Sequence, residues 1–317
     1  MYFLGVDCGG TKTLFVISTE DGRILGSFRT TSGSFFGKQK DGIRELIANG
    51  TEEVCRRAGI EVGQITYAGL GFPGYGEKEG SEDAIRQACK EALGTERIVC
   101  ACDCALGWAG SLAMEPGINV IAGTGSNCYG INEKGESARA SGWGGCGDEG
   151  SCRWIGTKLI QLFTKQSDGR LPRTQLYDRF KAHYHIVNDT HFIFTLNHEV
   201  MRSGSDVAKL QMLVHELYQE GDPYARMIYE EAARELAQTV HAVAKKLEMG
   251  PGYRASYSGG LFHIGSVITE PLSREVAYLG GKLCAPRYTP EQGAVLLAMR
   301  AMDPNFSFEN LTFTTGE

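Results

Sequence analysis

Glycines gather in four short segments of this chain, and each segment stands beside serine or threonine. The segments are Gly9-Gly10 before Thr11, Gly123-Thr124-Gly125 before Ser126, Gly142 to Gly150, and Ser258-Gly259-Gly260. Bare glycine backbone lets peptide N–H groups approach phosphate oxygens closely, and hydroxyl side chains add further donors. The chemistry that these segments indicate is phosphate binding, with simple tight turns as the alternative.

Two common nucleotide-binding motifs do not fit these segments. A mononucleotide P-loop requires serine or threonine after Gly-Lys, but Gly37-Lys38 is followed by glutamine and Gly281-Lys282 by leucine. The dinucleotide motif G-x-G-x-x-G that would start at Gly123 fails because Cys128 replaces its third glycine. A phosphate site in this chain therefore requires another fold.

The strands expected around the first two glycine segments repeat one pattern. In each copy an apolar strand enters a glycine turn, a second strand leaves it, and a charged residue plus glycine starts the return. The copies are Tyr2–Val6, Leu14–Ser18 and Arg23–Phe28, and then Asn119–Ala122, Cys128–Ile131 and Ser137–Ala140. Glycine suits such hairpins because it tolerates the positive φ of tight turns. The pattern predicts an internal duplication.

Helices and further strands are expected between and after these hairpins. Alternating segments predict one α/β domain after the first hairpin, and Gly150 to Leu247 is expected to be mainly helical. The expected elements are a helix over Asp41–Arg57, a strand over Ile65–Leu70, a helix within Gly76–Leu93, a strand over Arg97–Cys102, a strand over Ala255–Ser258, and helices over Ser266–Leu279 and Pro290–Met302. The tail Asp303–Glu317 shows no periodic pattern.

Composition narrows the classes of partner. The 317 residues favour two domains, and the net charge of −6 without a basic run argues against a nucleic-acid partner. No apolar stretch reaches the roughly 18 residues of a membrane span, so no membrane partner is expected. Ten cysteines in a chain of this length indicate reduced thiols and a cytoplasmic location.

Four motifs give the chain a resemblance to a known family. Val6–Lys12, Ile121–Asn127, Gly142-Trp143-Gly144 and Gly147–Ser151 are similar to segments of the N-acetylglucosamine kinase family. That family belongs to the superfamily of acetate and sugar kinases, heat-shock chaperones and actin, alongside ATPase activators of the benzoyl-CoA reductase type. The resemblance runs from Gly5 to about Ala298.

The resemblance implies a two-lobed α/β fold of the actin-like ATPase (ribonuclease H-like) type. Residues 1–115, completed by a C-terminal helix within 290–317, would form the N-terminal lobe, and residues 116–289 the C-terminal lobe with a helical insertion. ATP and Mg²⁺ would bind with the substrate between the lobes. The expected reaction transfers the γ-phosphate to a hydroxyl, the 6-OH, of N-acetylglucosamine or a related amino sugar, in a homodimer.

The resemblance also assigns site residues. ATP would contact the two hairpins and a third loop, through Asp7, Gly9, Gly10, Thr11, Lys12, Gly123, Thr124, Gly125, Ser258, Gly259 and Gly260. The sugar would contact Ser34, Asp103, Ser126, Asn127, Trp143, Gly144 and Asp148. Asp103 would be the catalytic base, and Asp7 would hold Mg²⁺ through water.

Each carboxylate also has a simpler interpretation. Asp103 follows a strand and precedes a helix, which is typical of a helix cap, although a helix N-terminus also favours an ionised base. Asp7 suits a turn cap, and Asp148 and Glu149 suit the start of the helix near Ser151. For Glu149 the two interpretations stay open.

Substrate identity and two other functions stay open at this point. The family carries a substrate-binding asparagine after the third strand, whereas this chain has Thr30 to Phe36. There Ser34 would supply a shorter hydrogen bond, or Phe35 and Phe36 would shape a pocket for a bulkier substituent. Cysteines near the motifs suggest an iron-sulfur ATPase activator as one alternative, and the other is a non-catalytic sugar sensor.

Overall fold

The chain folds into two units, and the computed structural model describes residues 1–33 and 35–315, with residues 35–37 and 146 described by their backbone alone. Unit 1 comprises residues 1–119 and 285–317, and unit 2 comprises residues 120–284. Unit 1 is therefore discontinuous in sequence, whereas unit 2 is a single stretch.

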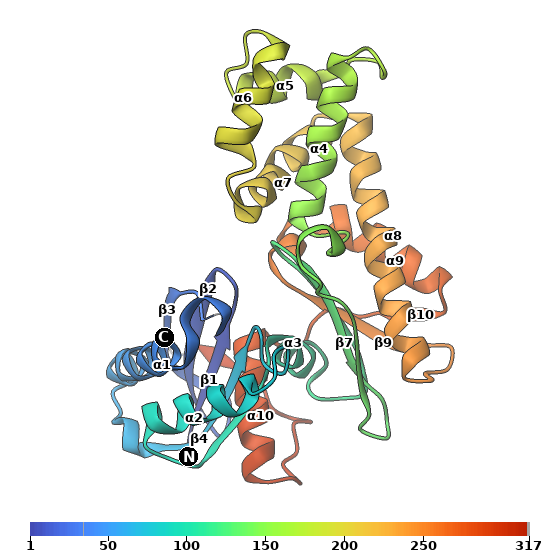
Figure 1. Cartoon of the computed structure of the whole chain (residues 1–317). Helices are drawn as coiled ribbons and strands as arrows, with labels where there is room; N and C mark the ends of the chain where they lie inside the picture. Colours follow the sequence, from blue (N-terminus) through green and yellow to red (C-terminus); the bar gives the residue numbers. More distant parts are fainter. Residues whose placement is uncertain (34, 316–317) are drawn as a thin grey trace. The chain divides into compact units, whose positions relative to one another are not determined.

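Unit 1 is built on one mixed sheet with helices on both faces (Figure 1). Its elements are β1 (Tyr2–Cys8), β2 (Lys12–Thr19), β3 (Arg23–Thr31), α1 (Phe35–Ala58), β4 (Ile65–Phe72), α2 (Ser81–Leu93), β5 (Ile98–Cys102), α3 (Asp103–Leu112), α10 (Pro290–Met302) and β11 (Thr314–Thr315), with a 3-10 turn at Val62–Gln64. The strand order is β11-β3-β2-β1-β4-β5. The strands β1 to β3 form an antiparallel meander, and β4 and β5 continue it in parallel with β1.

Alternation along β1 divides the core of unit 1 between the two faces of the sheet. Leu4, Val6 and Cys8 pack with α1 and α2, whereas Phe3 packs with α10 on the opposite face. Residues two apart in a strand share a face, so Gly5 and Asp7 belong to the α10 face. This register determines the side of the sheet on which the Asp7 carboxylate lies.

Helix α10 approaches the sheet so closely that side chains must be missing there. A Cβ on Gly69 of β4 would stand 1.9 Å from the carbonyl oxygen of Ala294, and one on Gly5 would stand 2.4 Å from that of Glu291. Glycine at these positions therefore lets α10 lie directly on β1 and β4. Because Gly5 meets Glu291 and Phe3 packs with Met299, the N-terminus of α10 points toward Asp7.

Unit 2 repeats the same sheet and adds a helical insertion. Its elements are β6 (Gly117–Ala122), β7 (Ser126–Ile131), β8 (Ser137–Ser141), α4 (Cys152–Ser167), α5 (Gln175–His183), α6 (Phe192–Thr195), α7 (Gly204–Gln219), α8 (Pro223–Lys246), β9 (Tyr253–Ser258), α9 (Ser266–Tyr278) and β10 (Gly281–Leu283). Four shorter turns lie at Gly145–Gly147, Asp189–His191, Leu196–Val200 and Gly260–Ile264. The strand order β10-β9-β6-β7-β8 matches β5-β4-β1-β2-β3 of unit 1, so the predicted duplication is confirmed.

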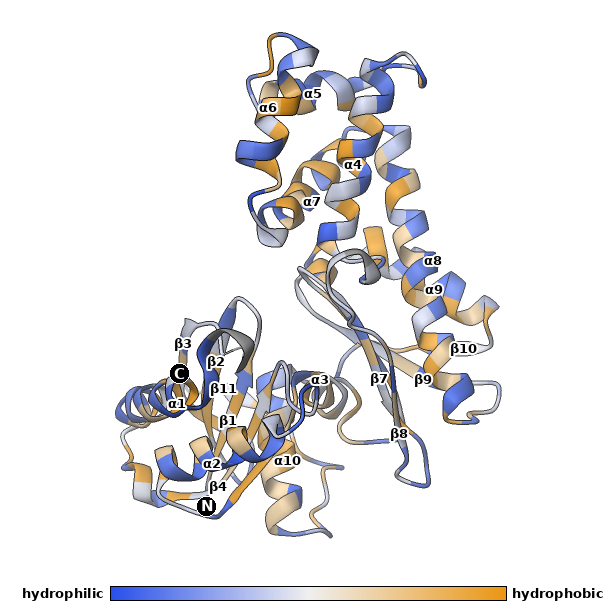
Figure 2. Cartoon of the chain, viewed as in Figure 1, coloured by the Kyte–Doolittle hydropathy of each residue, from blue (hydrophilic) through white to orange (hydrophobic). Residues whose placement is uncertain are grey.

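The insertion between β8 and β9 has a core of its own. Helix α4 packs on α7, and stacked and edge-on rings of Phe163, Tyr177, Phe180 and Phe192 fill the space beside α5. Helix α8 returns the chain to the sheet, where it contacts β7, β8 and α9. Figure 2 shows hydrophobic and hydrophilic residues alternating along α8, as the amphipathic sequence predicts.

Two local predictions differ from the structure. The tail after Met302, whose sequence shows no periodic pattern, contributes β11, which pairs in parallel with β3. The expected helix over Asp41–Arg57 begins earlier, at Phe35, and a positive φ of 54° at Gln39 breaks its first turn.

Candidate active site

Asp7 and Asp103 lie at the same edge of the unit 1 sheet. In the register across β1, β4 and β5, Asp7 is opposite Gly71, and Gly71 is opposite Ala101. The three strands are parallel, so their carboxyl ends meet at one edge, and Asp103 follows Ala101 by two residues. Unit 1 therefore brings together two of the carboxylates that the sequence singled out.

The hairpin after Asp7 is closed by a bond from the Gly9 N–H to the Lys12 carbonyl, at 2.7 Å. Neither Gly9 nor Gly10 has a positive φ, so the expectation that this turn uses glycine for its positive φ is wrong. A Cβ on Gly9 would stand 3.1 Å from the Lys12 oxygen, whereas one on Gly10 would meet nothing within 4 Å. The hairpin tip at Gly10 and Thr11 is exposed, which leaves its backbone open to a ligand.

Asp7 stands in a strongly negative environment. Burial, the carboxylate of Glu291 and that of Asp103 raise the pKa of Asp7 to about 7, against the opposite effect of Lys12. Glu291, in the first turn of α10, is a candidate site residue that the sequence did not indicate. Glu291 acts on Asp7 because α10 packs against Gly5, and no local sequence motif indicates that packing.

Asp103 is the first residue of α3, and Cys102 occupies the helix cap position, so Asp103 is not the cap. Its Oδ1 accepts hydrogen bonds from the Cys104 N–H at 3.0 Å and from the Cys104 thiol at 3.5 Å. Burial raises the pKa of Asp103, the two Cys104 bonds lower it, and the charge of Glu77 raises it further. The net direction is upward, which suits a group that must take up a proton.

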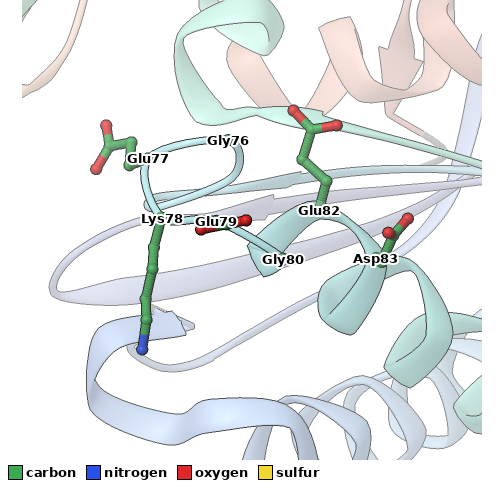
Figure 3. Close-up of a pocket in the computed structure, with 7 residues that line it drawn as sticks. All are labelled: Gly76, Glu77, Lys78, Glu79, Gly80, Glu82 and Asp83. Carbon is green, nitrogen blue, oxygen red and sulfur yellow. The ribbon is translucent and has the colours of Figure 1, made fainter.

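The loop that carries Glu77 forms a pocket between β4 and α2 (Figure 3). Its lining is Gly76, Glu77, Lys78, Glu79, Gly80, Glu82 and Asp83. Figure 3 shows Glu77 and Lys78 pointing in opposite directions from this loop. The pocket is polar and mostly acidic, and Glu77 extends its negative charge toward Asp103.

The segment after β3 lies against the first hairpin. The Ser32 hydroxyl donates to the Gly9 carbonyl at 3.1 Å, and a Cβ on Gly33 would stand 2.7 Å from the Cys8 sulfur. Ser34, predicted to contact the sugar, lies outside the described residues, as do the side chains of Phe35 and Phe36. The segment that follows β3 thus starts beside the Gly9 hairpin.

The second hairpin is held by the start of α4. The N–H groups of Cys152 and Arg153 donate to the carbonyls of Gly123 and Thr124, at 2.9 and 3.3 Å. In a trans peptide the N–H points opposite to the C=O, so the N–H groups of Thr124 and Gly125 point away from α4. The exposed Thr124 lies at this tip.

Asp148 packs against the same hairpin in unit 2. A Cβ on Gly125 would stand 2.4 Å from Asp148 Oδ2, while Asp148 Oδ1 accepts from the Gly144 N–H at 2.8 Å. The cap of α4 is Ser151, whose hydroxyl accepts from the Trp154 N–H, so the capping interpretation of Asp148 is wrong. Asn127 borders this cluster through Gly142, where a Cβ would stand 2.5 Å from its amide nitrogen.

Ser126 and Trp143 differ sharply in their surroundings. Ser126 is buried, and its hydroxyl donates to the Glu149 carbonyl at 2.8 Å, which joins the hairpin to the loop before α4. Trp143 is 79% exposed, next to Gly144 in the loop that Asp148 holds. Trp143 therefore offers a free aromatic face, whereas the Ser126 hydroxyl is engaged by the protein.

The third loop lies beside the second hairpin. Gly259 has φ 103°, and a Cβ on it would stand 2.3 Å from the carbonyl oxygen of Ala122. A Cβ on Gly123 would stand 3.9 Å from the Gly260 nitrogen. Unit 2 thus brings Gly123-Thr124-Gly125 and Ser258-Gly259-Gly260 together, as adjacent loops of one ligand site require.

Two features of the described residues bear on metals and membranes. In the described ranges, no three side chains of His, Cys, Asp or Glu converge to form a metal site by themselves. Within the same ranges, none of the helices combines the length and the apolar character that crossing a bilayer demands.

Comparisons with known proteins find similar sequences and a similar structure. The chain is 32% identical over 262 residues to the N-acetylmuramic acid/N-acetylglucosamine kinase of Clostridium acetobutylicum, over 78% of this chain and 81% of the relative. It is 26% identical over 322 residues to the N-acetyl-D-glucosamine kinase of Dictyostelium discoideum, over 94% and 98%. The crystal structure of a candidate N-acetylglucosamine kinase from Chromobacterium violaceum has a TM-score of 0.76 at 25% identity, over 94% and 98%.

These relatives place the chain among two-lobed sugar kinases of the actin-like ATPase fold, which are phosphotransferases that use ATP. The sequence profile of the BadF/BadG/BcrA/BcrD ATPase family matches residues 4–298. This range includes both hairpins, Asp103, Asp148 and most of α10. The chain belongs to the BadF/BadG/BcrA/BcrD ATPase family.

Proposed function

We propose that this protein is an amino-sugar kinase that transfers the γ-phosphate of ATP to the 6-OH of N-acetylglucosamine or a closely related amino sugar. The observation that carries the proposal is the position of Asp103, at the start of α3 and at the same sheet edge as Asp7 and the Gly9 hairpin. The two curated relatives, both kinases named for N-acetylglucosamine, support the substrate class.

The roles of the unit 1 residues follow from their chemistry. The sugar hydroxyl attacks the γ-phosphorus as the bond to the bridging oxygen of ADP breaks, and Asp103 takes the hydroxyl proton. The raised pKa of Asp103 makes its carboxylate a better proton acceptor than an ordinary aspartate. The hairpin of Gly9, Gly10, Thr11 and Lys12 contributes amide, hydroxyl and ammonium donors to the phosphates.

Asp7 fits a magnesium ion. The charges of Glu291 and Asp103 oppose the ionisation of Asp7, and a divalent cation would relieve this repulsion. Mg²⁺ prefers oxygen ligands and is commonly held by one or two carboxylates together with water and substrate phosphates, so Asp7 would hold it through water. When bound, the ion would neutralise charge on the phosphate oxygens during transfer.

The unit 2 residues would hold ATP and the sugar. Thr124 and Gly125 offer their N–H groups to phosphate, and the loop Ser258-Gly259-Gly260 beside them accommodates the adenosine portion. Asp148 accepts from sugar hydroxyls, the exposed face of Trp143 packs on the sugar ring, and Asn127 donates from its amide. Ser126 positions this hairpin through its bond to the Glu149 carbonyl.

A panel of sugars tests the reaction and the substrate together. ADP release would be followed with N-acetylglucosamine, glucosamine, N-acetylmuramic acid and glucose, and the phosphorylated position assigned by phosphorus–proton NMR. We expect sugar-dependent ADP release and a 6-phosphate product. The 6-deoxy analogue of the best sugar is the matched control, and it should release no ADP above background.

The same panel separates the alternatives. ADP release that no sugar stimulates would indicate an ATPase activator, and sugar binding without ADP release would indicate a sensor. Asp103→Asn should keep ATP binding, measured by calorimetry, and lose phosphoryl transfer by at least roughly a hundredfold, because a general base contributes about 10²-fold or more. Full activity in Asp103→Asn would remove Asp103 from the reaction.

A further inference from the structure

Cys104 makes two bonds to the same oxygen of Asp103. Its N–H donates to Asp103 Oδ1 at 3.0 Å, and its thiol donates to the same atom at 3.5 Å. Cys104 is buried in the first turn of α3, so this arrangement is fixed by the helix and its packing. Both donors act on one side of the carboxylate and restrain its rotation.

A second thiol continues this arrangement. Cys102, at the cap position of α3, also contacts the Cys104 thiol. The Cys102 contact, burial and the Asp103 charge hold the pKa of Cys104 well above its usual range, so its thiol keeps the proton that it donates.

We propose that Cys104 is a positioning residue for Asp103: it holds Oδ1 and thereby presents Oδ2 to the attacking hydroxyl. This inference rests on the proposed role of Asp103 as the base. A carboxylate has two oxygens, and only one needs to face the substrate. Holding the other oxygen removes the rotational freedom that would misalign the proton acceptor.

A neutral donor suits this task better than a cation would. A cation on Oδ1 would stabilise the ionised carboxylate and weaken it as a base. The thiol is a weak donor, so it orients the carboxylate at a small cost in basicity. The charge of Glu77 acts on Asp103 in the opposite direction, and the pKa of Asp103 stays raised.

Three substitutions at Cys104 test the proposal in the full-length protein. Cys104→Ala and Cys104→Val both lack the side-chain donor but differ in volume, whereas Cys104→Ser keeps a donor. We expect kcat with saturating ATP and sugar to fall roughly three- to tenfold in both apolar variants, the effect of losing one hydrogen bond, with KM for both substrates unchanged. Cys104→Ser should restore kcat to within about twofold of the wild type.

The control is Cys55→Ala, which converts another buried thiol of unit 1, near the C-terminal end of α1, to a methyl group. It should leave kcat unchanged, and thermal unfolding would show that each variant is folded at the assay temperature. A Cys104→Ser variant as slow as Cys104→Ala, or apolar variants that differ according to their volume, would show that packing and not donation matters and would overturn the proposal.

The assay also separates this inference from the proposed function. If Asp103→Asn loses transfer but the apolar Cys104 variants keep the wild-type kcat, the positioning role alone is overturned. If Asp103→Asn keeps transfer, or if no sugar stimulates ADP release, the assignment of the base fails and the positioning role fails with it.

Discussion

At the scale of single residues, negative charge dominates the candidate site of unit 1. The charges of Glu291 and Asp103 act on Asp7, and the charge of Glu77 acts on Asp103. Like charges this close raise the pKa of a carboxylate, because each ionisation occurs against the field of the others. The site is therefore poised to gain from a cation and to take up a proton.

The pH dependence of transfer is a first prediction at this scale. A base acts when ionised, so activity should be present above the pKa of Asp103 and lost as pH falls through it. Since the Glu77 charge raises that pKa, Glu77→Gln should move the acid limb of the kcat/KM profile to lower pH. Glu79→Gln, in the same loop, is the control and should leave the limb in place.

Asp148 gives a second prediction. Asp148→Asn keeps an oxygen that can accept from the Gly144 N–H but loses the charge offered to sugar hydroxyls. We expect the KM for sugar to rise by roughly tenfold and the KM for ATP to stay unchanged. A hydrogen bond to a charged group is stronger than a neutral one by about 1 kcal/mol or slightly more, which corresponds to roughly tenfold in binding. An Asp148→Asn enzyme with the wild-type sugar KM would exclude this contact. Asp168→Asn, an exposed residue after α4, is the comparison variant.

The sequence indicated some of these residues and missed others for a physical reason. Asp7 and Asp103 stand at strand ends beside a turn and a helix start, and such positions are visible in the residue pattern. Glu291 reaches the site because α10 packs on Gly5, and Cys104 depends on the orientation of one carboxylate. The contact of Glu291 is not local in sequence and leaves no motif, and the bond from the adjacent Cys104 depends on a side-chain orientation that residue types do not specify.

At the scale of elements, close packing of α10 on the sheet gives a third prediction. Gly69→Ala would place a methyl group where the Ala294 carbonyl stands, so α10 must shift. We expect a loss of about 1–3 kcal/mol in the free energy of unfolding, as for other overpacked cores, measured by urea titration. Gly63→Ala, where a Cβ meets nothing within 4 Å, should change it by less than about 0.5 kcal/mol.

The helical insertion gives a fourth prediction, through Asp189. Burial opposes ionisation of Asp189, but bonds from Lys181, Tyr177 and Ser167 lower its pKa to about 2. A lowered folded-state pKa stabilises the fold above the unfolded value of about 4, and this contribution disappears as pH falls toward 2. Asp189→Asn should therefore cost stability at pH 6, and the difference from the wild type in urea titrations should shrink by pH 3. A difference independent of pH would contradict the ionic role.

Long, strongly patterned elements were predictable, and short ones were not. The spacing of apolar residues and the turn residues between them predict the two meanders and the helices α7, α8 and α10. Strands β10 and β11 have three and two residues, too few to show a period. The hairpins at Gly9 and Gly123 were predicted correctly for a wrong reason, because their glycines accommodate close neighbours or open space rather than a positive φ.

At the scale of the whole molecule, the division of the chain gives a fifth prediction. Unit 1 contains α10, whose Val295, Leu296 and Met299 are fully buried. A chain ending at Cys284 would expose the α10 face of the sheet, so we expect unit 1 to lose cooperative unfolding and the protein to aggregate. A chain ending at Phe313, which lacks β11 alone, should unfold near the wild-type temperature. Calorimetry of both truncated chains would check this.

The discontinuity of unit 1 also orders events during synthesis. The ribosome releases residues 1–119 first, then all of unit 2, and only afterwards the segment that carries α10. Domains fold as units while the chain emerges, so unit 2 can be complete while the sheet of unit 1 still lacks one covering layer. Unit 1 thus starts to form before unit 2 but is completed after it. Until α10 emerges, the apolar face of its sheet is an exposed surface to which a chaperone that acts on nascent chains would bind.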